Sequence, residues 1–288
     1  MRDGGRVWIT AAVIGSVFLT MLILETARPL RRAIEPKLQR LARNLTTAGI
    51  ALAVVTLLQT PILLPVSGWA ARHNVGLLHL IALPRWLQIA AAVILMDYTL
   101  WFWHYWNHKV PFLWRFHLVH HVDRDLDAST GLRFHFGEQA LSVFYRAIQI
   151  VAIGADPLAV WIWQLLLFAS VLFHHSNARL PIGLERVLVR LVVTPRMHGI
   201  HHSDYRNETD SNWSSLLSVW DYLHRTALLD VPQQAVAIGV PAYSDAKEVT
   251  LPKILVLPFR EQKDDWSRVD GSPPHRPHDA ETKTILRV

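Results

Sequence analysis

The chain has 288 residues, of which 51% are hydrophobic and only 18% are charged, and it contains no cysteine. The charged fraction is below that of ordinary soluble domains, which is about a quarter. Disordered chains are poorer in apolar residues, so this composition excludes a disordered chain. The lack of cysteine excludes a disulfide scaffold and any thiolate-bound metal. The formal net charge of +6 is compatible with nucleic-acid binding, but membrane proteins also carry basic loops.

Three stretches are long and apolar enough to cross a bilayer as helices, which takes about 20 mostly apolar residues. Residues 7–24 and 45–66 carry no charge, and residues 86–103 contain only Asp97. A secretory signal has a shorter apolar run and a small-residue cleavage site, so the first stretch is predicted to be an uncleaved span.

A fourth apolar region covers residues 139–173 and is divided by the sequence Gly-Ala-Asp-Pro at 154–157. Each half is short for a full crossing at about 1.5 Å per residue, so we expect a hairpin whose two ends emerge on the same side. The predicted fold class is therefore all-α: an integral membrane helical bundle of three to five spans or hairpin helices, with a cytoplasmic helical cap.

The distribution of Lys and Arg in the short loops predicts the orientation in the membrane. The loop between the first two spans is strongly basic, whereas residues 67–84 contain only Arg72. We therefore expect a multi-pass protein of the inner membrane, with the N-terminus outside and residues 104–138 in the cytoplasm. The basic residues of the first loop are Arg28, Arg31, Arg32, Lys37, Arg40 and Arg43.

Histidine is unusually frequent, with 16 residues, and half of them fall in the three boxes HYWNH (104–108), HLVHH (117–121) and HGIHH (198–202). Residues three and four apart share one face of a helix, so each box is expected to present its ring nitrogens to one spot. Eight to ten imidazoles exceed what one ion holds, which predicts two ions. Neutral imidazole suits iron, zinc, copper and nickel alike. The predicted metal ligands are His104, His108, His117, His120, His121, His135, His175, His198, His201 and His202.

These boxes and their surroundings resemble the fatty acid hydroxylase / sterol desaturase superfamily of membrane di-iron oxygenases. The resemblance is carried by DYTLWFWHYWNH, WRFHLVHHVDRDLDASTGLRFHFGE, HSN and TPRMHGIHHSDYRNETDSNWSSLLSVWD, and covers about residues 86–226. Two motifs depart from the family pattern: RFHFGE lacks the proline of RxHPxE but keeps His135 and Glu138, and WDYLH replaces WDxLF. Both departures bear on substrate fit more than on metal binding.

The resemblance implies two non-haem iron ions that use O2 and external electrons to hydroxylate or desaturate a lipid. The sequence does not decide between these two outcomes, and the di-iron centre itself performs the chemistry with no separate acid or base assigned. The chain has no cysteine, no CxxCH and no GxGxxG motif, so a separate ferredoxin, rubredoxin or cytochrome with its reductase is expected to supply the electrons.

We divide the chain into N-terminal transmembrane helices (1–83), a di-iron domain (84–230), a C-terminal extension (231–266) and a disordered tail (267–288). Metal-bound histidines usually donate their other N–H to a carboxylate or a carbonyl. The residues expected to support the ligands in this way are Asp97, Glu138, Asn177, Asn212 and Asp221. Arg196 is expected to hold a carboxylate, and His174 to be a neighbour of the centre.

Other classes of protein are compatible with a histidine-rich membrane chain. A b-type cytochrome would place its haem ligands within spans, and a divalent-metal carrier would need polar residues along a path across the bilayer, whereas these histidines lie beyond the span ends. A zinc-dependent membrane hydrolase would keep the metal sites but bind zinc without iron.

Overall fold

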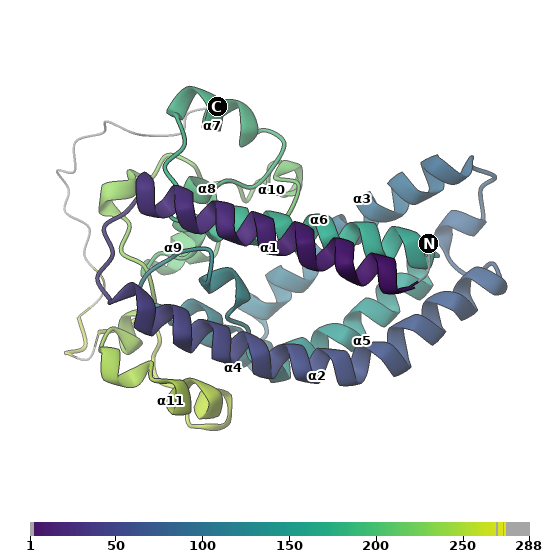
Figure 1. Ribbon diagram of the computed structural model, residues 1–288. Helices are drawn as coiled ribbons and strands as arrows, with labels where there is room; N and C mark the ends of the chain where they lie inside the picture. Colours follow the sequence, from purple (N-terminus) through teal and green to yellow (C-terminus); the bar gives the residue numbers. More distant parts are fainter. Residues whose placement is uncertain (1–2, 269, 273, 275–288) are drawn as a thin grey trace.

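The computed structural model of this chain describes residues 3–268, 270–272 and 274, which form helices joined by short loops (Figure 1). The α-helices are α1 (Asp3–Ala27), α2 (Lys37–Arg72), α3 (Arg85–Lys109), α4 (Pro111–His121), α5 (Phe136–Ile153), α6 (Pro157–His175), α7 (Ile182–Leu188), α8 (Pro195–His201), α9 (Arg206–Thr209), α10 (Val219–His224) and α11 (Leu251–Val256). Short 3₁₀ helices cover Leu77–His79, Thr130–Leu132, Gln233–Ala235, Pro241–Tyr243, Ala246–Glu248 and Leu257–Phe259. Extended pairing within the described residues is limited to isolated bridges, so the all-α prediction is confirmed.

Four helices are long and apolar enough to cross a membrane: α1, α2, α3 and α6. The three predicted spans fall inside α1, α2 and α3. Helix α2 has 36 residues, about 54 Å at 1.5 Å per residue, so it continues well beyond the hydrocarbon core. Large apolar side chains on these helices stay exposed, such as Leu19 at 59% and Leu57 at 73%, as lipid-facing positions require.

The predicted hairpin is formed by α5 and α6, but the expectation that both halves are short is wrong for α6. This helix continues to His175, and its 19 residues are enough to cross. The turn between the helices follows from its sequence: Gly154 has a left-handed φ of 79°, and the Asp156 carboxylate accepts two backbone N–H bonds at the start of α6. Both ends of the hairpin lie at the histidines, since Glu138 contacts His117 and His175 contacts another imidazole.

The main apolar core lies between α2, α3, α5 and α6. Its centre contains Met96, Val143, Ile150 and Trp163, all fully buried. This packing holds α5 and α6 rigidly against α3, which carries the first histidine box.

The C-terminal extension packs against α4. Leu118 and Val119 of α4 are buried in one cluster with Tyr243 and Ile254. The Trp114 indole also donates a hydrogen bond of 2.7 Å to the Asp265 carboxylate. Most of the predicted disordered tail lies outside the described residues.

Candidate metal centre

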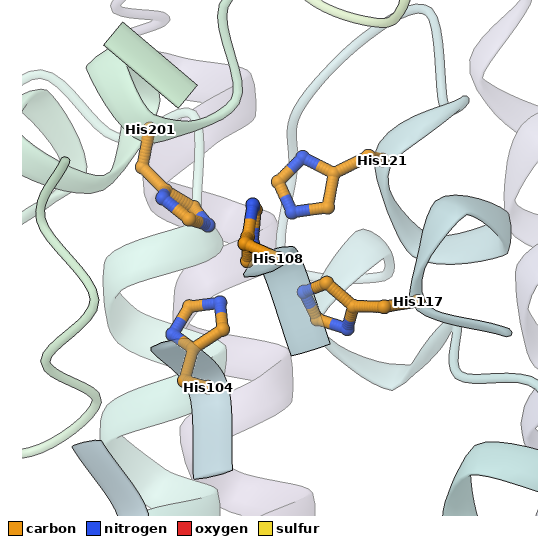
Figure 2. A group of neighbouring side chains, drawn as sticks. All are labelled: His104, His108, His117, His121 and His201. Atoms are coloured by element: carbon orange, nitrogen blue, oxygen red, sulfur yellow. The ribbon is translucent and has the colours of Figure 1, made fainter. Parts of the chain in front are cut away.

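A group of five imidazoles converges at the end of the bundle where α3 meets α4 and α8 (Figure 2). Its members are His104, His108, His117, His121 and His201, whose ligand nitrogens all lie within 4.8 Å of one another. The buried Nε2 atoms of four of them have no hydrogen-bond partner among the described residues: His108, His117, His121 and His201. We call these five residues the first group.

A second group of four buried imidazoles consists of His120, His175, His198 and His202. The Nε2 atom of His175 lies 3.0 Å from those of both His120 and His198. The Nε2 atom of His198 is in turn 3.1 Å from that of His202. The structure therefore brings together all the predicted ligands except His135.

Backbone carbonyls fix the protonation of several rings, because a carbonyl oxygen can only accept a hydrogen bond. His175 Nδ1 lies 2.8 Å from the Val171 carbonyl and His120 Nδ1 lies 3.3 Å from the Arg133 carbonyl. Both Nδ1 atoms therefore carry the proton, and both Nε2 atoms present lone pairs. In the first group, the Nδ1 atoms of His104 and His201 each lie 2.7 Å from a backbone carbonyl and are fixed in the same way.

The Nε2 atoms of His120 and His175 cannot hydrogen-bond to each other, since each offers only a lone pair. Facing lone pairs at 3.0 Å are repulsive unless a cation lies between them. Two nitrogens bound at about 2.1 Å and at right angles to one ion would be about 3.0 Å apart. The second group thus fits a bound metal ion.

Burial favours the neutral form of several imidazoles on and beside α4 and α8. It lowers the pKa of His120, His121, His198 and His202 well below the ordinary value, and neighbouring imidazoles lower it further. Burial also lowers the pKa of His201 to about 3. Neutral imidazole is the form that binds a metal.

The expectation that each box points to one spot is wrong for the second and third boxes. In each box, the first and last histidines, four residues apart, belong to the same group. The middle histidine, His120 or His201, belongs to the other group. At 3.6 residues per turn, adjacent positions diverge by about 100°, so neighbours such as His120 and His121 cannot face one spot. The second box contributes its pair, His117 and His121, to the first group. The third box contributes its pair, His198 and His202, to the second group.

Comparison with protein families matches residues 89–226 to the fatty acid hydroxylase family. We call residues 89–226 the fatty acid hydroxylase segment of the chain. This segment contains both histidine groups in full, so the candidate metal centre lies inside it. The comparison with solved structures found no match.

Curated relatives each match about half of the chain. An ornithine lipid hydroxylase of Rhizobium tropici is 32% identical over 142 residues, which cover 49% of this chain and 41% of that protein. A cholesterol 25-hydroxylase-like protein of Danio rerio is 28% identical, over 48% of this chain and 55% of that protein. An alkylglycerol monooxygenase of Xenopus tropicalis is 28% identical, over 46% of this chain and 28% of that protein. The match thus spans about half the length of the first two relatives and less of the third.

The fatty acid hydroxylase segment also supplies groups that orient the ligands. The Glu138 carboxylate accepts a hydrogen bond of 3.0 Å from His117 Nδ1, as expected for a residue that supports a ligand. The carbonyls of Ser211 and Trp213, which sequence reasoning missed, accept from His201 and His104. No sequence pattern marks a backbone carbonyl, since every residue has one.

Asn212 and Asp221 contact the backbone near the imidazoles and not the rings themselves. The Asn212 amide donates to the Met197 and Leu228 carbonyls, and the Asp221 carboxylate accepts from the backbone N–H groups of Trp213 and Ser214. They therefore hold the loop whose carbonyls orient two ligands.

Among the described residues, neither Asp97 nor Asn177 forms a hydrogen bond with an imidazole. Asp97 accepts from the Trp220 indole at 2.6 Å, and Asn177 bonds to the backbone of Arg31. Both join distant segments of the chain instead. The expectation for Arg196 is confirmed, since its Nε atom lies 2.7 Å from the Glu185 carboxylate.

His135 lies outside both groups because both of its ring nitrogens are already used. Its Nδ1 accepts the Gly137 N–H at 3.0 Å, and its Nε2 donates to the Leu255 carbonyl at 3.1 Å. No lone pair is left for a metal, and we omit His135 from the proposed ligands. His174 also lies outside the groups, with its ring centre 4.1 Å from that of His198.

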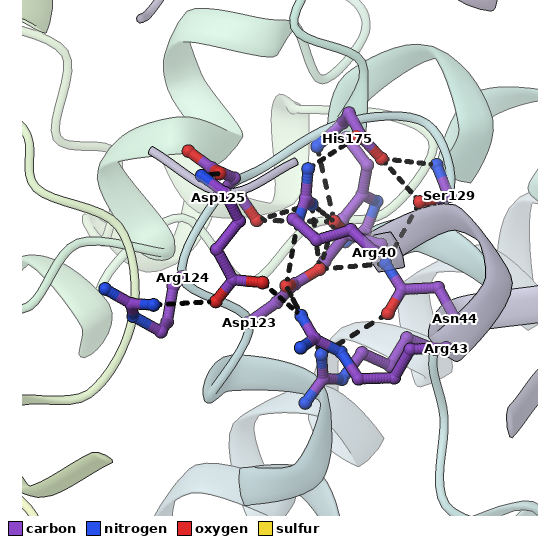
Figure 3. A network of polar contacts seen from close by, with 12 residues as sticks. Arg40, Arg43, Asn44, Asp123, Arg124, Asp125, Ser129 and His175 are labelled. Carbon is purple, nitrogen blue, oxygen red and sulfur yellow. Dashed lines mark hydrogen bonds and ion pairs between the residues drawn. The ribbon is translucent and has the colours of Figure 1, made fainter. Parts of the chain in front are cut away.

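A buried ion network joins α2 to the loop that follows the second box (Figure 3). Arg40 lies 2.9 Å from Asp123 and 2.6 Å from Asp127, and Arg43 and Arg133 also contact Asp123. Burial alone would raise the pKa of Asp123, but Arg40 and Arg133 outweigh it and hold that pKa well below its usual range. Arg133 in turn provides the carbonyl that faces His120. The acidic sequence DRDLD directly after the box was the available signal for this network.

Replacement of Arg40 by Met should destabilise the protein, because Asp123 and Asp127 would lose a buried partner. A loss of about 3–5 kcal/mol is expected, seen as a lower unfolding temperature in detergent. Arg32→Met is the matched control, since Arg32 lies in the loop just before α2 and is exposed. Equal unfolding temperatures for the two variants would contradict this role of the network.

His120→Ala and His121→Ala should each remove a ligand from a different group. Metal content, measured by mass spectrometry of the purified protein, should fall to about half of the wild-type value in each variant. The two positions are adjacent on α4, so the local disturbance is matched. His73→Ala, at an exposed position outside both groups, should keep the full content. Unchanged metal content in both box variants would disprove the grouping.

Glu138→Gln should weaken metal retention, because a neutral amide is a poorer acceptor for the His117 N–H than a carboxylate. Loss of such an outer partner typically costs about 10–100-fold in metal affinity. Competition with a chelator measures this effect, with Gln139→Ala as the neighbouring control. A chelator titration identical to that of the wild type would argue against the orienting role of Glu138.

Proposed function

We propose that this protein is a membrane-bound lipid hydroxylase that uses O2 and two iron ions, one held by each histidine group. The observation that carries the proposal is the pair of converging imidazole groups inside the fatty acid hydroxylase segment. Relatives named hydroxylase and monooxygenase support a reaction that inserts oxygen.

The identity of the metal follows from the type of reaction. Imidazole ligands alone accept several metals, but zinc has no redox chemistry and cannot serve a monooxygenase by itself. Iron, when bound, would supply activation of O2 and removal of hydrogen from an unactivated C–H bond. A zinc hydrolase and a haem protein are correspondingly less favoured.

The residues of the chain have three tasks in this proposal. The Nε2 atoms of the two groups hold the ions. Backbone carbonyls that face Nδ1 keep four of the rings oriented: His104, His120, His175 and His201. Glu138 retains the proton on His117 Nδ1, which leaves His117 Nε2 as the donor. Burial of the rings excludes bulk water from the reacting centre, which protects a reactive oxidant from side reactions.

A lipid substrate is supported by the position of the centre at the ends of α3 and α6, both long and apolar enough to cross a membrane. Trp106, Val110 and Phe112 are 42%, 39% and 56% exposed. Trp106 lies within the first box, and the other two lie between the first and second boxes. These side chains offer an apolar approach from the bilayer to the imidazoles. The relatives are named for an ornithine lipid, cholesterol and an alkylglycerol, which have in common that they are lipids.

The location proposed is the inner membrane, with the histidine groups on the cytoplasmic side. Arg40 and Arg43 of the basic first loop are paired with acidic residues. The orientation rule counts Lys and Arg and gives little weight to acidic residues, so this pairing leaves the predicted orientation unchanged. A cytoplasmic centre would receive electrons from a separate ferredoxin, rubredoxin or cytochrome system.

Lipid mass spectrometry of cells with and without the protein tests the proposed reaction. We expect a lipid heavier by one oxygen atom, with that atom derived from labelled O2. The product should disappear with His108→Ala and persist with His73→Ala, because only His108 belongs to a metal group. A product lighter by two hydrogens would indicate desaturation, and an unchanged lipid profile would contradict the assignment.

A further inference from the structure

Helix α7 and the turn after it have two distinct faces. On the inner face, Glu185 is fully buried and bonds to Arg196 of α8, and Val189 is buried against Val193 and Met197. This face fixes α7 to the helix that carries the third histidine box.

The outer face is apolar and exposed. Leu184, Val187 and Leu191 are 50%, 60% and 64% exposed. Leu184 and Val187 are three positions apart on α7, so their side chains share one face of the helix. Leu191 lies in the turn that follows. Nothing else among the described residues covers them. Large apolar side chains clustered in this way mark a surface that binds another apolar phase.

The position of α7 relates this face to the membrane. The segment just before α7 pairs with the segment just after α1: Pro29 bridges to Ala178, and the Arg179 N–H donates to the Arg28 carbonyl at 2.8 Å. Helix α7 therefore begins close to the end of a helix that is long and apolar enough to cross a membrane. In Figure 1 α7 projects from the side of the bundle, level with the C-terminal part of α1.

Exposed basic residues lie just before and just after α7 in the chain. Arg28, Arg179 and Arg190 are exposed and form no ion pair with any described residue. Exposed arginines beside an apolar helix face are typical of helices that lie in the plane of an anionic membrane surface.

We propose that α7 is an in-plane membrane-docking helix. Leu184, Val187 and Leu191 insert at the boundary between headgroups and acyl chains, while Arg179 and Arg190 contact anionic headgroups. The occupant of the face is the bilayer, not a second copy of the chain, because an apolar centre bordered by arginines complements an anionic lipid surface. Docking would hold α8 at a constant depth relative to the bilayer.

The natural absence of cysteine allows a direct test, since a single introduced cysteine can carry a spin label. The protein with Val187→Cys is reconstituted into vesicles of phosphatidylcholine and phosphatidylglycerol, and collisions of the label with O2 and with a water-soluble nickel chelate are measured. Leu57→Cys within α2 calibrates a lipid-facing label, and Lys247→Cys in an exposed loop calibrates a water-facing one. The test needs no activity, so it is independent of the proposed reaction.

We expect the label at position 187 to collide with O2 and to lose collisions with nickel, as at position 57. Nickel collisions equal to those at position 247 would overturn the proposal, and protection from both reagents would indicate a protein partner and overturn it as well. Vesicles without phosphatidylglycerol should give weaker protection, and this difference should shrink in the Arg179→Gln/Arg190→Gln variant. Equal protection in both kinds of vesicle would disprove the headgroup contacts.

Discussion

The structure depends on one unfavourable arrangement: buried nitrogen lone pairs that point at one another. The carbonyls of Val171 and Arg133 fix the protons of His175 and His120 on Nδ1, which leaves two acceptors facing each other at 3.0 Å. Burial prevents water from separating them, and the lowered pKa of His120 prevents protonation of that ring from relieving the repulsion. A metal cation satisfies all of these groups together, so the fold of the metal centre and the binding of ions are coupled.

The rest of the fold maintains this convergence from several directions. Helices α3 and α6 bring histidines from the ends of two candidate spans, and α4 and α8 supply the remaining ligands from the cap. The ion network around Asp123 attaches the start of α2 to the loop behind the second box, and the C-terminal extension covers the opposite face of α4. The loop held by Asn212 and Asp221 completes the support. Ligand rings placed by so many separate contacts are oriented before a metal or a substrate arrives.

Much of this arrangement could be predicted from the sequence. Uninterrupted apolar runs identified α1, α2 and α3, and the repeated histidine spacings identified nearly all the grouped imidazoles. The division between two groups was missed, because helical periodicity was applied to each box as a unit and not to His120 and His121 separately. His135 was misjudged because its use depends on the Leu255 carbonyl, 120 residues away. The length of α6 was underestimated, since its last residues, His174 and His175, are polar.

A structure of the iron-loaded protein with anomalous X-ray scattering recorded at the iron absorption edge tests the central claim most directly. The account predicts two separate anomalous peaks, one bounded by the Nε2 atoms of His120 and His175 and one within the group that contains His108. A single peak, or iron bound away from these nitrogens while their rings keep the same orientation, would contradict it.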